Sequence, residues 1–539
     1  MTHPDAGTTP DAPLWWQRGI IYQIYPRSFM DANGDGVGDL AGIAQRLDYL
    51  EWLGVDAVWI SPFYPSPMAD FGYDIADHTN VDPLFGTLAD FDRLRDALHQ
   101  RGIRLILDLV PNHTSSAHPW FVASRRSRED PRRDWYLWAD PAPDGGPPNN
   151  WLSVFGGGAW EWDAHTRQYY YHAFLKEQPD LNWRNPAVRA AMYDVMRFWL
   201  DRGVDGFRVD VMWHMIKDQE LRDNPVNPQY TPDRATYEQL LPVFSTDQPE
   251  VHDIVHEMRR VTDEYPERVL IGEVYLPIER LVTYYGPELG GAHLPFNFQL
   301  VTLPWHAPTI GAAVAAYEGA LPAGAWPNWV LGNHDQPRVA SRVGAAQARV
   351  AAMLLLTLRG TPTLYFGDEL GMPDVPIPPH LARDPQQLNM PELRIGRDPE
   401  RTPMPWDASP GAGFTTGQPW LPIVEGTTTM SVAAQRDHPG SMLALHRALI
   451  ALRHAEPALH RGDYRPVYTA GDALAYGREW RGRGFLVALN LGATPAVVRP
   501  VTFELRGTVA LQTSLGREGE RVEDEVRLGP NEGVVVRLD

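Results

Sequence analysis

The chain has 539 residues, of which 43% are hydrophobic and 22% charged, so it is long enough for two or three globular domains with a large buried core. Its 68 acidic and 48 basic residues give a formal net charge of −20, which argues against nucleic acid or an anionic membrane as a partner, since both require basic surfaces. The absence of cysteine excludes disulfides, thiolate nucleophiles and cysteine-bound metals.

Residues 1–13 have neither the basic region nor the apolar run of a secretory signal, and they are expected to form a disordered tail. No run of 18 apolar residues occurs in the sequence, so no membrane-spanning helix is predicted. The lack of cysteine permits a reducing compartment, and a cytoplasmic location is expected.

Short β-rich apolar runs come next along the chain, and they alternate with longer helical patterns such as residues 90–101. Eight runs separated by helices favour a closed parallel (β/α)₈ TIM barrel, an α/β fold, over an open sheet. The sixth run has the weakest pattern. The predicted strands are residues 20–25, 57–60, 104–109, 206–209, 269–272, 293–298, 329–331 and 363–365.

Two stretches interrupt this alternation. Residues 112–180 are rich in Pro, Gly, Asp and Trp and contain no pattern of a barrel helix, so they predict a separate loop domain inserted after the third strand. The barrel is then divided into residues 14–111 and 181–457, and its second part includes an irregular, proline-rich subdomain at about 367–437. Residues 458–539 contain short alternating segments such as 485–490 and 532–538, which predict a C-terminal antiparallel β-sandwich.

Polar residues are concentrated at the ends of four predicted strands. In such barrels the carboxyl ends of the strands form the functional face. A single carboxylate at a strand end is more often a helix cap, but four carboxylates around one barrel mouth are not explained in that way. These residues are Asp108, Asn112, His113, Arg208, Asp210, Glu273, Tyr275, Asn333, His334 and Asp335.

A pair of carboxylates with different roles is what the hydrolysis of a glycosidic bond requires. Arg208 and Asp210 lie on the same face of their strand, so the guanidinium is expected to hold Asp210 ionised. Glu273 stands beside Val274, and desolvation and nearby carboxylates are expected to raise its pKa so that it can donate a proton.

The segments that carry these residues resemble the four signature regions of the α-amylase superfamily, glycoside hydrolase family 13. The segments WWQRGIIYQIYPRSFMDANGDGVGDL, DFGYD, QPDLNW, GNHDQPR and RDPERTPMPWD are similar to the α-glucosidase and oligo-1,6-glucosidase branch of that family. The resemblance extends over residues 15–453. The C-terminal segment resembles the family only in its general pattern of short alternating segments.

The resemblance implies a role for each matching residue. Asp210 is expected to be the nucleophile, Glu273 the acid/base and Asp335 the carboxylate that distorts the bound sugar. Asp70 and Arg401 are expected to pair at the floor of the pocket and grip the non-reducing end, while Asp108 is expected to be structural. The other expected substrate-binding residues are Tyr73, His113, Phe174, Arg208, Val211, His334 and Arg338, with Trp151 and Phe155 as further candidates for the pocket wall.

The loop from Asp31 to Asp39 has alternating oxygen ligands and glycines, a spacing that suits a hard cation or a solvated acidic turn. In the similar glucosidases this loop binds Ca²⁺ or Mg²⁺, so a structural cation is expected and no organic cofactor. Its ligands would be Asp31, Asn33, Asp35, Val37 and Asp39. The α-amylases use a different calcium site that involves residues placed like Asn112 and His214. Here His214 is expected to be a packed structural histidine.

The expected reaction is the removal of terminal α-linked glucose from a small oligosaccharide or disaccharide with retention of configuration. Val211, which directly follows the nucleophile, resembles enzymes that accept α-1,6 bonds, so isomaltose is favoured, with sucrose and α-1,4 bonds as other candidates. A sucrose isomerase, trehalose synthase or other transglucosidase shares the same triad and stays open. A non-catalytic relative, like the heavy chains of amino-acid transporters, is a remote alternative because the catalytic residues are intact.

Overall fold

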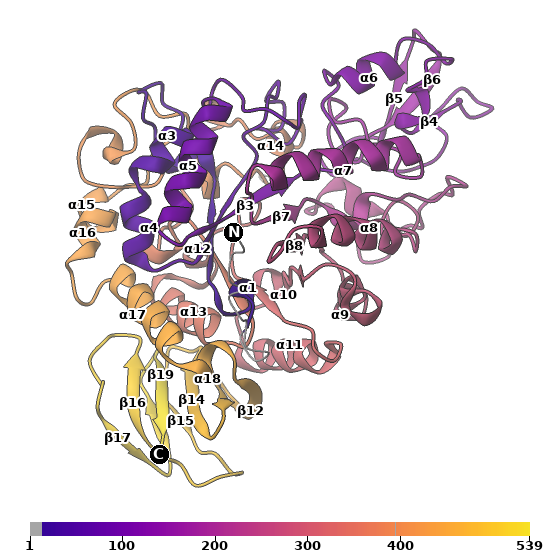
Figure 1. The fold of residues 1–539 in the computed structure, drawn as a ribbon. Coiled ribbons are helices and arrows are strands. Elements are labelled where there is room, and N and C mark those ends of the chain that lie inside the picture. The colour runs from indigo at the N-terminus through magenta and orange to yellow at the C-terminus, as the bar shows by residue number, and fades with distance from the viewer. Residues whose placement is uncertain (1–12, 394) are drawn as a thin grey trace, which may run out of the picture.

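A computed structural model of the protein describes residues 13–393 and 395–539. Within them, eight parallel strands are hydrogen bonded in the order β10-β11-β1-β2-β3-β7-β8-β9, whose two ends are consecutive in the chain. This is the (β/α)₈ arrangement that the sequence predicts, and that prediction is confirmed (Figure 1). The strands are β1 (Ile21–Ile24), β2 (Ala57–Ile60), β3 (Arg104–Leu109), β7 (Gly206–Val209), β8 (Val269–Gly272), β9 (Leu294–Pro295), β10 (Asn328–Val330) and β11 (Thr361–Tyr365).

The helices that follow the strands cover the outside of the barrel, and several of them bury one apolar face. Helix α5 begins at a capping box in which Thr87 and Asp90 exchange hydrogen bonds, and α7 begins with a proline after the N-cap Asn185. The main barrel helices are α3 (Leu40–Gln45), α4 (Leu47–Leu53), α5 (Leu88–Gln100), α7 (Pro186–Asp201), α8 (Val251–Asp263), α11 (Ala307–Ala320), α13 (Ala345–Thr357) and α17 (Met442–Ala455). Shorter helices lie at Trp15–Arg18, Pro26–Phe29, Ile278–Leu281, Gln299–Thr302 and Val339–Val343.

The segment between β3 and α7 forms a small unit at one end of the molecule (Figure 1). It contains α6 (Pro119–Ser124) and a three-stranded antiparallel sheet of β4 (Trp138–Ala139), β6 (Gln168–Tyr171) and β5 (Trp160–Asp163). Its base is held by the buried Lys217, whose Nζ donates to Asn112 Oδ1 at 2.7 Å and pairs with Asp180 Oδ2 at 2.5 Å. The lysine ammonium therefore neutralises Asp180, which connects this unit to the barrel.

The sequence did not predict a second long irregular segment, which follows β7. Residues 218–250, after β7, contain one short 3₁₀ turn at Thr236–Gln239 and otherwise no helix or strand. Asn150 Nδ2 donates to Asn224 O at 2.9 Å, which joins residues 218–250 to the inserted unit. Residues 367–437 are irregular, as predicted, with the short helices α14 (Pro385–Asn389), α15 (Thr427–Met430) and α16 (Val432–Arg436).

The C-terminal residues form an antiparallel β-sandwich at the opposite end of the molecule from the inserted unit (Figure 1). The two sheets share a core of small and branched apolar side chains, including Val498, Val526 and Val536. Arg453 and Gln347 donate to backbone carbonyls at the junction with the barrel. Helix α18 (Pro457–His460) precedes the strands β12 (Asp463–Ala470), β13 (Ala473–Trp480), β14 (Arg483–Asn490), β15 (Ala496–Val498), β16 (Arg506–Gln512), β17 (Arg521–Glu523), β18 (Val526–Leu528) and β19 (Gly533–Leu538).

The predicted tail of residues 1–13 lies almost wholly outside the described residues. The predicted strands agree with the structure to within a few residues. The largest difference is the sixth strand, which has only Leu294 and Pro295 where residues 293–298 were expected. Proline has no backbone N–H to donate to a ladder, which is consistent with so short a strand.

Candidate active site

The carboxyl ends of the strands surround one cavity of about 380 Å³, which the inserted unit and residues 218–250 partly cover. Its lining brings together side chains from the loop after β2 and from the segments that directly follow β7, β8 and β10. Of the residues expected at the site, nine line this cavity: Asp70, Tyr73, His113, Phe174, Asp210, Val211, Glu273, His334 and Asp335.

Three buried carboxylates share one guanidinium at the floor of the cavity. Arg208 Nη1 lies 2.7 Å from Asp210 Oδ1 and 2.9 Å from Asp108 Oδ1, and Nη2 lies 2.7 Å from Glu273 Oε2. Because Asp210 and Glu273 each contact a different nitrogen of one planar group, their carboxyls face each other across the cavity floor. The arrangement supplies two carboxyls that are close together in a largely desolvated site.

The expectation that Arg208 holds Asp210 ionised needs correction. Burial raises the pKa of Asp210 well above its ordinary range, and the charge of Glu273 adds to that rise, while Arg208 opposes it. Burial also raises the pKa of Glu273, against the opposing effect of Arg208. The guanidinium therefore does not select one of the two carboxyls, and the pair retains a proton that isolated carboxyls would have lost at the same pH.

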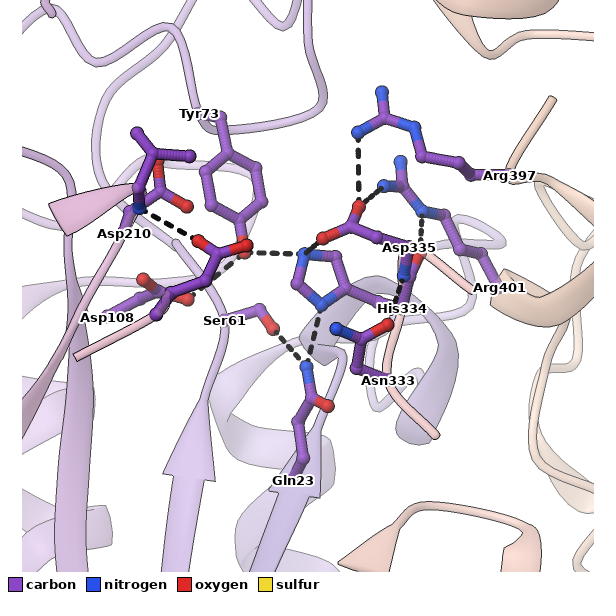
Figure 2. A network of polar contacts seen from close by, with 12 residues as sticks. Gln23, Ser61, Tyr73, Asp108, Asp210, Asn333, His334, Asp335, Arg397 and Arg401 are labelled. Atoms are coloured by element: carbon purple, nitrogen blue, oxygen red, sulfur yellow. Dashed lines mark hydrogen bonds and ion pairs between the residues drawn. The ribbon is translucent and has the colours of Figure 1, made fainter. Parts of the chain in front are cut away.

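A fourth carboxylate, Asp335, has the opposite environment. Burial alone would raise its pKa, but His334, Arg397 and Arg401 outweigh burial and hold the pKa below its ordinary range. Arg401 Nη2 donates to Asp335 Oδ1 at 2.7 Å, and Arg397 Nη1 donates to the same oxygen at 3.1 Å (Figure 2). Asp335 is therefore ionised across the physiological range.

His334 lies at the centre of a hydrogen-bond chain (Figure 2). Gln23 Nε2 donates to His334 Nδ1 at 2.8 Å, so the proton of the neutral imidazole lies on Nε2. Nε2 is 2.6 Å from the Tyr73 hydroxyl and 3.2 Å from Asp335 Oδ2. The Tyr73 hydroxyl in turn donates to Asp108 Oδ2 at 3.0 Å, and burial lowers the pKa of His334 well below its ordinary value. Asp108 thus supports Arg208 and Tyr73 rather than lining the cavity.

The partner expected for Asp70 was wrong. Arg397, and not Arg401, pairs with it: Arg397 Nη2 lies 2.8 Å from Asp70 Oδ1. Arg401 Nε instead donates to the carbonyl of His334 at 2.7 Å. Gln178, from the QPDLNW segment, donates to Asp70 Oδ2 at 3.1 Å and lies 3.2 Å from His113 Nε2.

Three arginines expected to bind substrate do not line the cavity. Arg208, Arg338 and Arg401 are each 0% exposed. Arg208 and Arg401 act on the site through the carboxylates that they contact. Arg338 donates to the carbonyl of Phe366 at 2.7 Å and lies 3.6 Å from Asp368, so it supports the barrel beneath the site.

The residue after Asp210 has an unusual backbone. Val211 has φ 37° and ψ 48°, the left-handed region that β-branched residues rarely adopt. Its N–H donates to Glu273 Oε2 at 2.8 Å, and its side chain lines the cavity. The local strain is thus held by a contact with Glu273, and backbone strain is commonly found at functional sites.

The entrance is built partly from residues that the sequence did not identify. His214 was expected to be a packed structural histidine, but it lines the cavity, where its ring lies 5.5 Å from that of Phe174. Phe155 also lines the cavity, whereas Trp151 packs in the inserted unit against Trp160. The cavity residues that sequence reasoning missed include Trp213, Asn224, Tyr237, Leu240, Thr246, Gln336, Gln386 and Arg397.

The acidic loop at 31–39 is held largely by its own backbone. Asp31 Oδ1 accepts from the N–H of Gly34 at 2.7 Å, and Asp39 Oδ1 accepts from the N–H of Gly42 at 2.6 Å as the N-cap of α3. Thr415 Oγ1 donates to Asp31 Oδ2 at 2.5 Å. Gly36 allows close packing here, because a Cβ at this position would lie 1.8 Å from the carbonyl oxygen of Gln418. Among the described residues, no three acidic or histidine side chains are grouped as metal ligands.

Comparisons with known proteins identify the family. The sequence profile of the α-amylase catalytic domain matches residues 23–462. The chain is 43% identical to a probable α-glucosidase of Rhizobium meliloti over 86% of both chains. It is 39% identical to an oligo-1,6-glucosidase of Heyndrickxia coagulans, over 88% of this chain and 92% of that protein. The crystal structure of the α-glucosyl transfer enzyme XgtA superposes with a TM-score of 0.92 at 42% identity, over 98% of this chain and 100% of the other.

The fold and these matches show that the chain belongs to the α-amylase family, glycoside hydrolase family 13. Within that family it falls in the branch of the α-glucosidases and oligo-1,6-glucosidases, and it is an enzyme. A trehalulose synthase of Pseudomonas mesoacidophila MX-45 and the amino acid transporter heavy chain SLC3A1 of Rattus norvegicus also match, at 35% and 38% identity. In the part of the chain that the structure describes, no helix is long and apolar enough to cross a membrane.

Proposed function

We propose that the protein is a retaining, exo-acting α-glucosidase that hydrolyses short oligosaccharides. The observation that carries this proposal is the pair Asp210 and Glu273, two buried carboxyls on one guanidinium with the ionised Asp335 nearby. Retaining glycosidases place their two carboxyls about 5–5.5 Å apart, so that one can attack the sugar while the other donates a proton. Because burial raises both pKa values, the pair is suited to supply the proton that the leaving group needs.

In the first step, the Asp210 carboxylate attacks C1 of the glucosyl ring and forms a covalent ester as the glycosidic bond breaks. Glu273 donates its proton to the departing oxygen, which leaves as the hydroxyl of the second sugar. In the second step, Glu273 removes a proton from water, which attacks C1 and releases glucose and free Asp210. Asp335 stays ionised throughout and accepts hydrogen bonds from the hydroxyls of the distorted ring.

Exo-action follows from the closed end of the cavity. Asp70 and Arg397 both line the cavity and pair at 2.8 Å, and we expect this ion pair to close the cavity behind the first glucose. We therefore expect glucose to be released one unit at a time from the non-reducing end. Soluble starch should lose viscosity only slowly while glucose accumulates. Rapid loss of viscosity before glucose appears would contradict the proposal.

The preference for α-1,6 bonds rests on Val211. Its β-branched side chain borders the cavity beside Glu273, where it would crowd an α-1,4-linked second ring, while the extra CH₂ of an α-1,6 bond lets that ring turn away. Val211→Thr is expected to shift the ratio of kcat/KM values toward maltose and away from isomaltose. A single contact of this kind changes selectivity by at most about 10–200-fold. A wild type that already prefers maltose, or an unchanged ratio in the variant, would show that Val211 is not the determinant.

A cation in the 31–39 loop is a separate proposal. The residues that would hold a Ca²⁺ or Mg²⁺ ion are Asp31, Asn33, Asp35, Val37 and Asp39, all of which supply the oxygen ligands that such ions prefer. A backbone N–H and the Thr415 hydroxyl already donate hydrogen bonds to the Asp31 carboxylate. Amide and carbonyl oxygens of the loop would therefore have to bind the cation together with the carboxylates. The loop provides none of the catalytic carboxyls, so the role would be structural.

Removal of this cation is expected to affect stability more than activity. A chelator should lower the Tm, because an ion bound only to the folded protein stabilises it, while turnover at low temperature should change little. Metal analysis of the purified protein, with calorimetry before and after chelation, measures both effects. A protein that contains no cation and keeps its Tm in the chelator would refute the proposal.

A transglucosylation reaction at the same site is the second candidate function, and the similarity of the chain to XgtA and to a trehalulose synthase supports it. In both reactions Asp210 forms the same covalent ester, and they differ only in whether water or a sugar hydroxyl attacks it. Chromatography of the products from maltose, isomaltose, sucrose and trehalose distinguishes them. Free glucose as the main product supports hydrolysis, and isomerised or elongated sugars support transfer.

A further inference from the structure

Asp384 is a buried carboxylate that the mechanism above does not use. It lies at the N-cap of α14, is 0% exposed and does not line the cavity. Its Oδ1 accepts hydrogen bonds from Arg397 Nη2 at 2.7 Å and Nε at 2.9 Å. Arg401 Nη1 lies 3.9 Å from the same oxygen. A buried carboxylate with two such contacts to one guanidinium fixes the plane of that group.

The guanidinium that Asp384 holds also contacts both carboxylates at the closed end of the cavity. Arg397 Nη2 lies 2.8 Å from Asp70 Oδ1, and Nη1 lies 3.1 Å from Asp335 Oδ1. Figure 2 shows Arg397 and Arg401 approaching Asp335 together. Arg401 is also held by the carbonyl of His334, whereas in the described part of the chain the Arg397 guanidinium donates to carboxylates alone. Two of its hydrogen bonds go to Asp384, which does not line the cavity, so we expect Asp384 to set its orientation.

We propose that Asp384 is a positioning residue for the reaction: it orients Arg397 and, through that guanidinium, aligns Asp70 and Asp335 against the first glucose. This inference rests on the proposed α-glucosidase function. Misplacement of binding groups by about 1 Å can cost about 10²-fold in rate, so a residue without direct substrate contact can have a large effect.

Asp384 also closes the base of the loop that it begins. Its Oδ2 accepts from the N–H of Arg397 at 3.2 Å, and Asp398 Oδ2 accepts from the N–H of Asp384 at 3.0 Å. The loop places Gln386 in the cavity lining, and Asn389 donates to the carbonyl of Phe155 at 3.1 Å. Asp384 and Asp398 therefore have the same backbone role, but only Asp384 contacts the guanidinium of Arg397.

This difference provides a matched pair of substitutions. Asp384→Asn keeps one oxygen for the backbone N–H groups but removes the charge that pairs with Arg397. Asp398→Asn makes the same chemical change at the other side of the loop base, away from that guanidinium. Asp384→Ser is a second neutral variant that retains a good N-cap, so it tests the same idea if the asparagine variant folds poorly.

The pH profile separates positioning from a structural defect. Burial raises the pKa of Asp70 to about 6, Arg397 and Arg401 lower it, and the charge of Asp384 raises it further. The other titratable groups near Asp70 include Tyr25, Asp74, Asp335, which shares Arg397 with it, and His113, which shares Gln178 with it. Loss of Asp384 removes a charge that raises this pKa and also releases the guanidinium that lowers it, so the acid limb of kcat/KM, which depends on ionised Asp70, should move. A defect in folding alone would lower the rate without moving that limb.

Kinetics of glucose release from isomaltose between pH 4.5 and 8 tests the proposal, with thermal melts as the folding control. Asp384→Asn is expected to lower kcat and raise KM, so that kcat/KM falls by about 10²-fold, and to shift the acid limb. Asp398→Asn should change kcat/KM only a few-fold and leave the limb in place. Equal behaviour of the two variants, or an unmoved limb in both neutral Asp384 variants, overturns the proposal. A wild type that releases no glucose from any α-glucoside would instead overturn the proposed function.

Discussion

Asp210→Asn is expected to lower kcat/KM by roughly 10⁴-fold or more, because the amide cannot form the covalent ester on which both steps depend. Folding should be retained. Burial raises the pKa of Asp210, which means that its ionised form costs stability, so a neutral amide of the same shape should leave the Tm at pH 7 unchanged or higher. Steady-state kinetics on an α-glucoside, with calorimetry on the same samples, measures both effects.

A control for this substitution lies at the other end of the same strand. Asp205 directly precedes β7, is 0% exposed, and pairs with Arg104 at 2.9 Å and with His99 at 2.7 Å, far from the cavity lining. Asp205→Asn should lower the Tm and leave kcat almost unchanged, which is the reverse of the result for Asp210→Asn. An Asp210→Asn variant that keeps more than a few per cent of the wild-type rate would refute the assignment of the nucleophile.

Glu273→Gln should lower the rate by roughly 10²–10⁴-fold on substrates with a sugar leaving group, since the leaving oxygen then departs without a proton. The loss should be much smaller with α-glucosyl fluoride, because fluoride leaves without protonation. An equal loss on both substrates would show that Glu273 is not the general acid.

Arg208→Met is expected to lower the free energy of unfolding by about 3–5 kcal/mol, because three carboxylates, Asp108, Asp210 and Glu273, lose the cation that they share. Activity should also be lost, since the two catalytic carboxyls are no longer held by one planar group. Chemical denaturation at several pH values measures the loss of stability.

The loss of stability caused by Arg208→Met should depend on pH in a defined direction. A carboxyl whose folded pKa is raised takes up a proton on folding, so its effect on stability is least at low pH and becomes more unfavourable as pH rises toward the folded pKa, which for Asp108 is about 6. Removal of Arg208 raises these folded pKa values further. The difference in stability between wild type and variant should therefore be larger at pH 8 than at pH 5.

Arg453 provides the matched control. It is equally buried, but its guanidinium donates to backbone carbonyls such as those of Leu356 and Leu358, not to carboxylates. Arg453→Met should lower stability by a similar amount at both pH values. If the Arg208→Met difference is also the same at pH 5 and pH 8, the shared guanidinium does not control the ionisation of the carboxyls.

The barrel and the position of the carboxylates at its mouth could be predicted from the sequence because their signals are local. Each strand is a short apolar run, and the polar residues that directly follow it must lie at the carboxyl face. Asp210, Glu273 and Asp335 are fixed to that face by a few residues of chain. The structure brings all three into one cavity for the same reason.

The partner of Asp70 could not be found in this way. Arg397 and Arg401 lie four residues apart in an irregular, proline-rich segment, where no hydrophobic period indicates which side chain faces the cavity. The choice depends on Asp384, which holds Arg397, and on the carbonyl of His334, which holds Arg401. Both contacts join segments that the fold alone brings together.

The segment that covers the cavity could not be predicted from the sequence for a similar reason. Residues 218–250 form neither a barrel helix nor a strand, and their position over the cavity depends on distant contacts such as that between Asn150 and Asn224. The left-handed backbone of Val211 also has no local signal, since valine disfavours it. Its conformation is compatible with the hydrogen bond to Glu273, which only the folded barrel supplies.

The central claim is that Asp210 and Glu273 perform two successive displacements at one carbon. Proton NMR of the wild-type reaction, recorded in the first minutes before mutarotation, identifies the anomer of glucose that is released first. Two inversions restore the original configuration, so the account predicts α-glucose, with the β anomer appearing only at the rate of mutarotation. Release of β-glucose as the first product would contradict it.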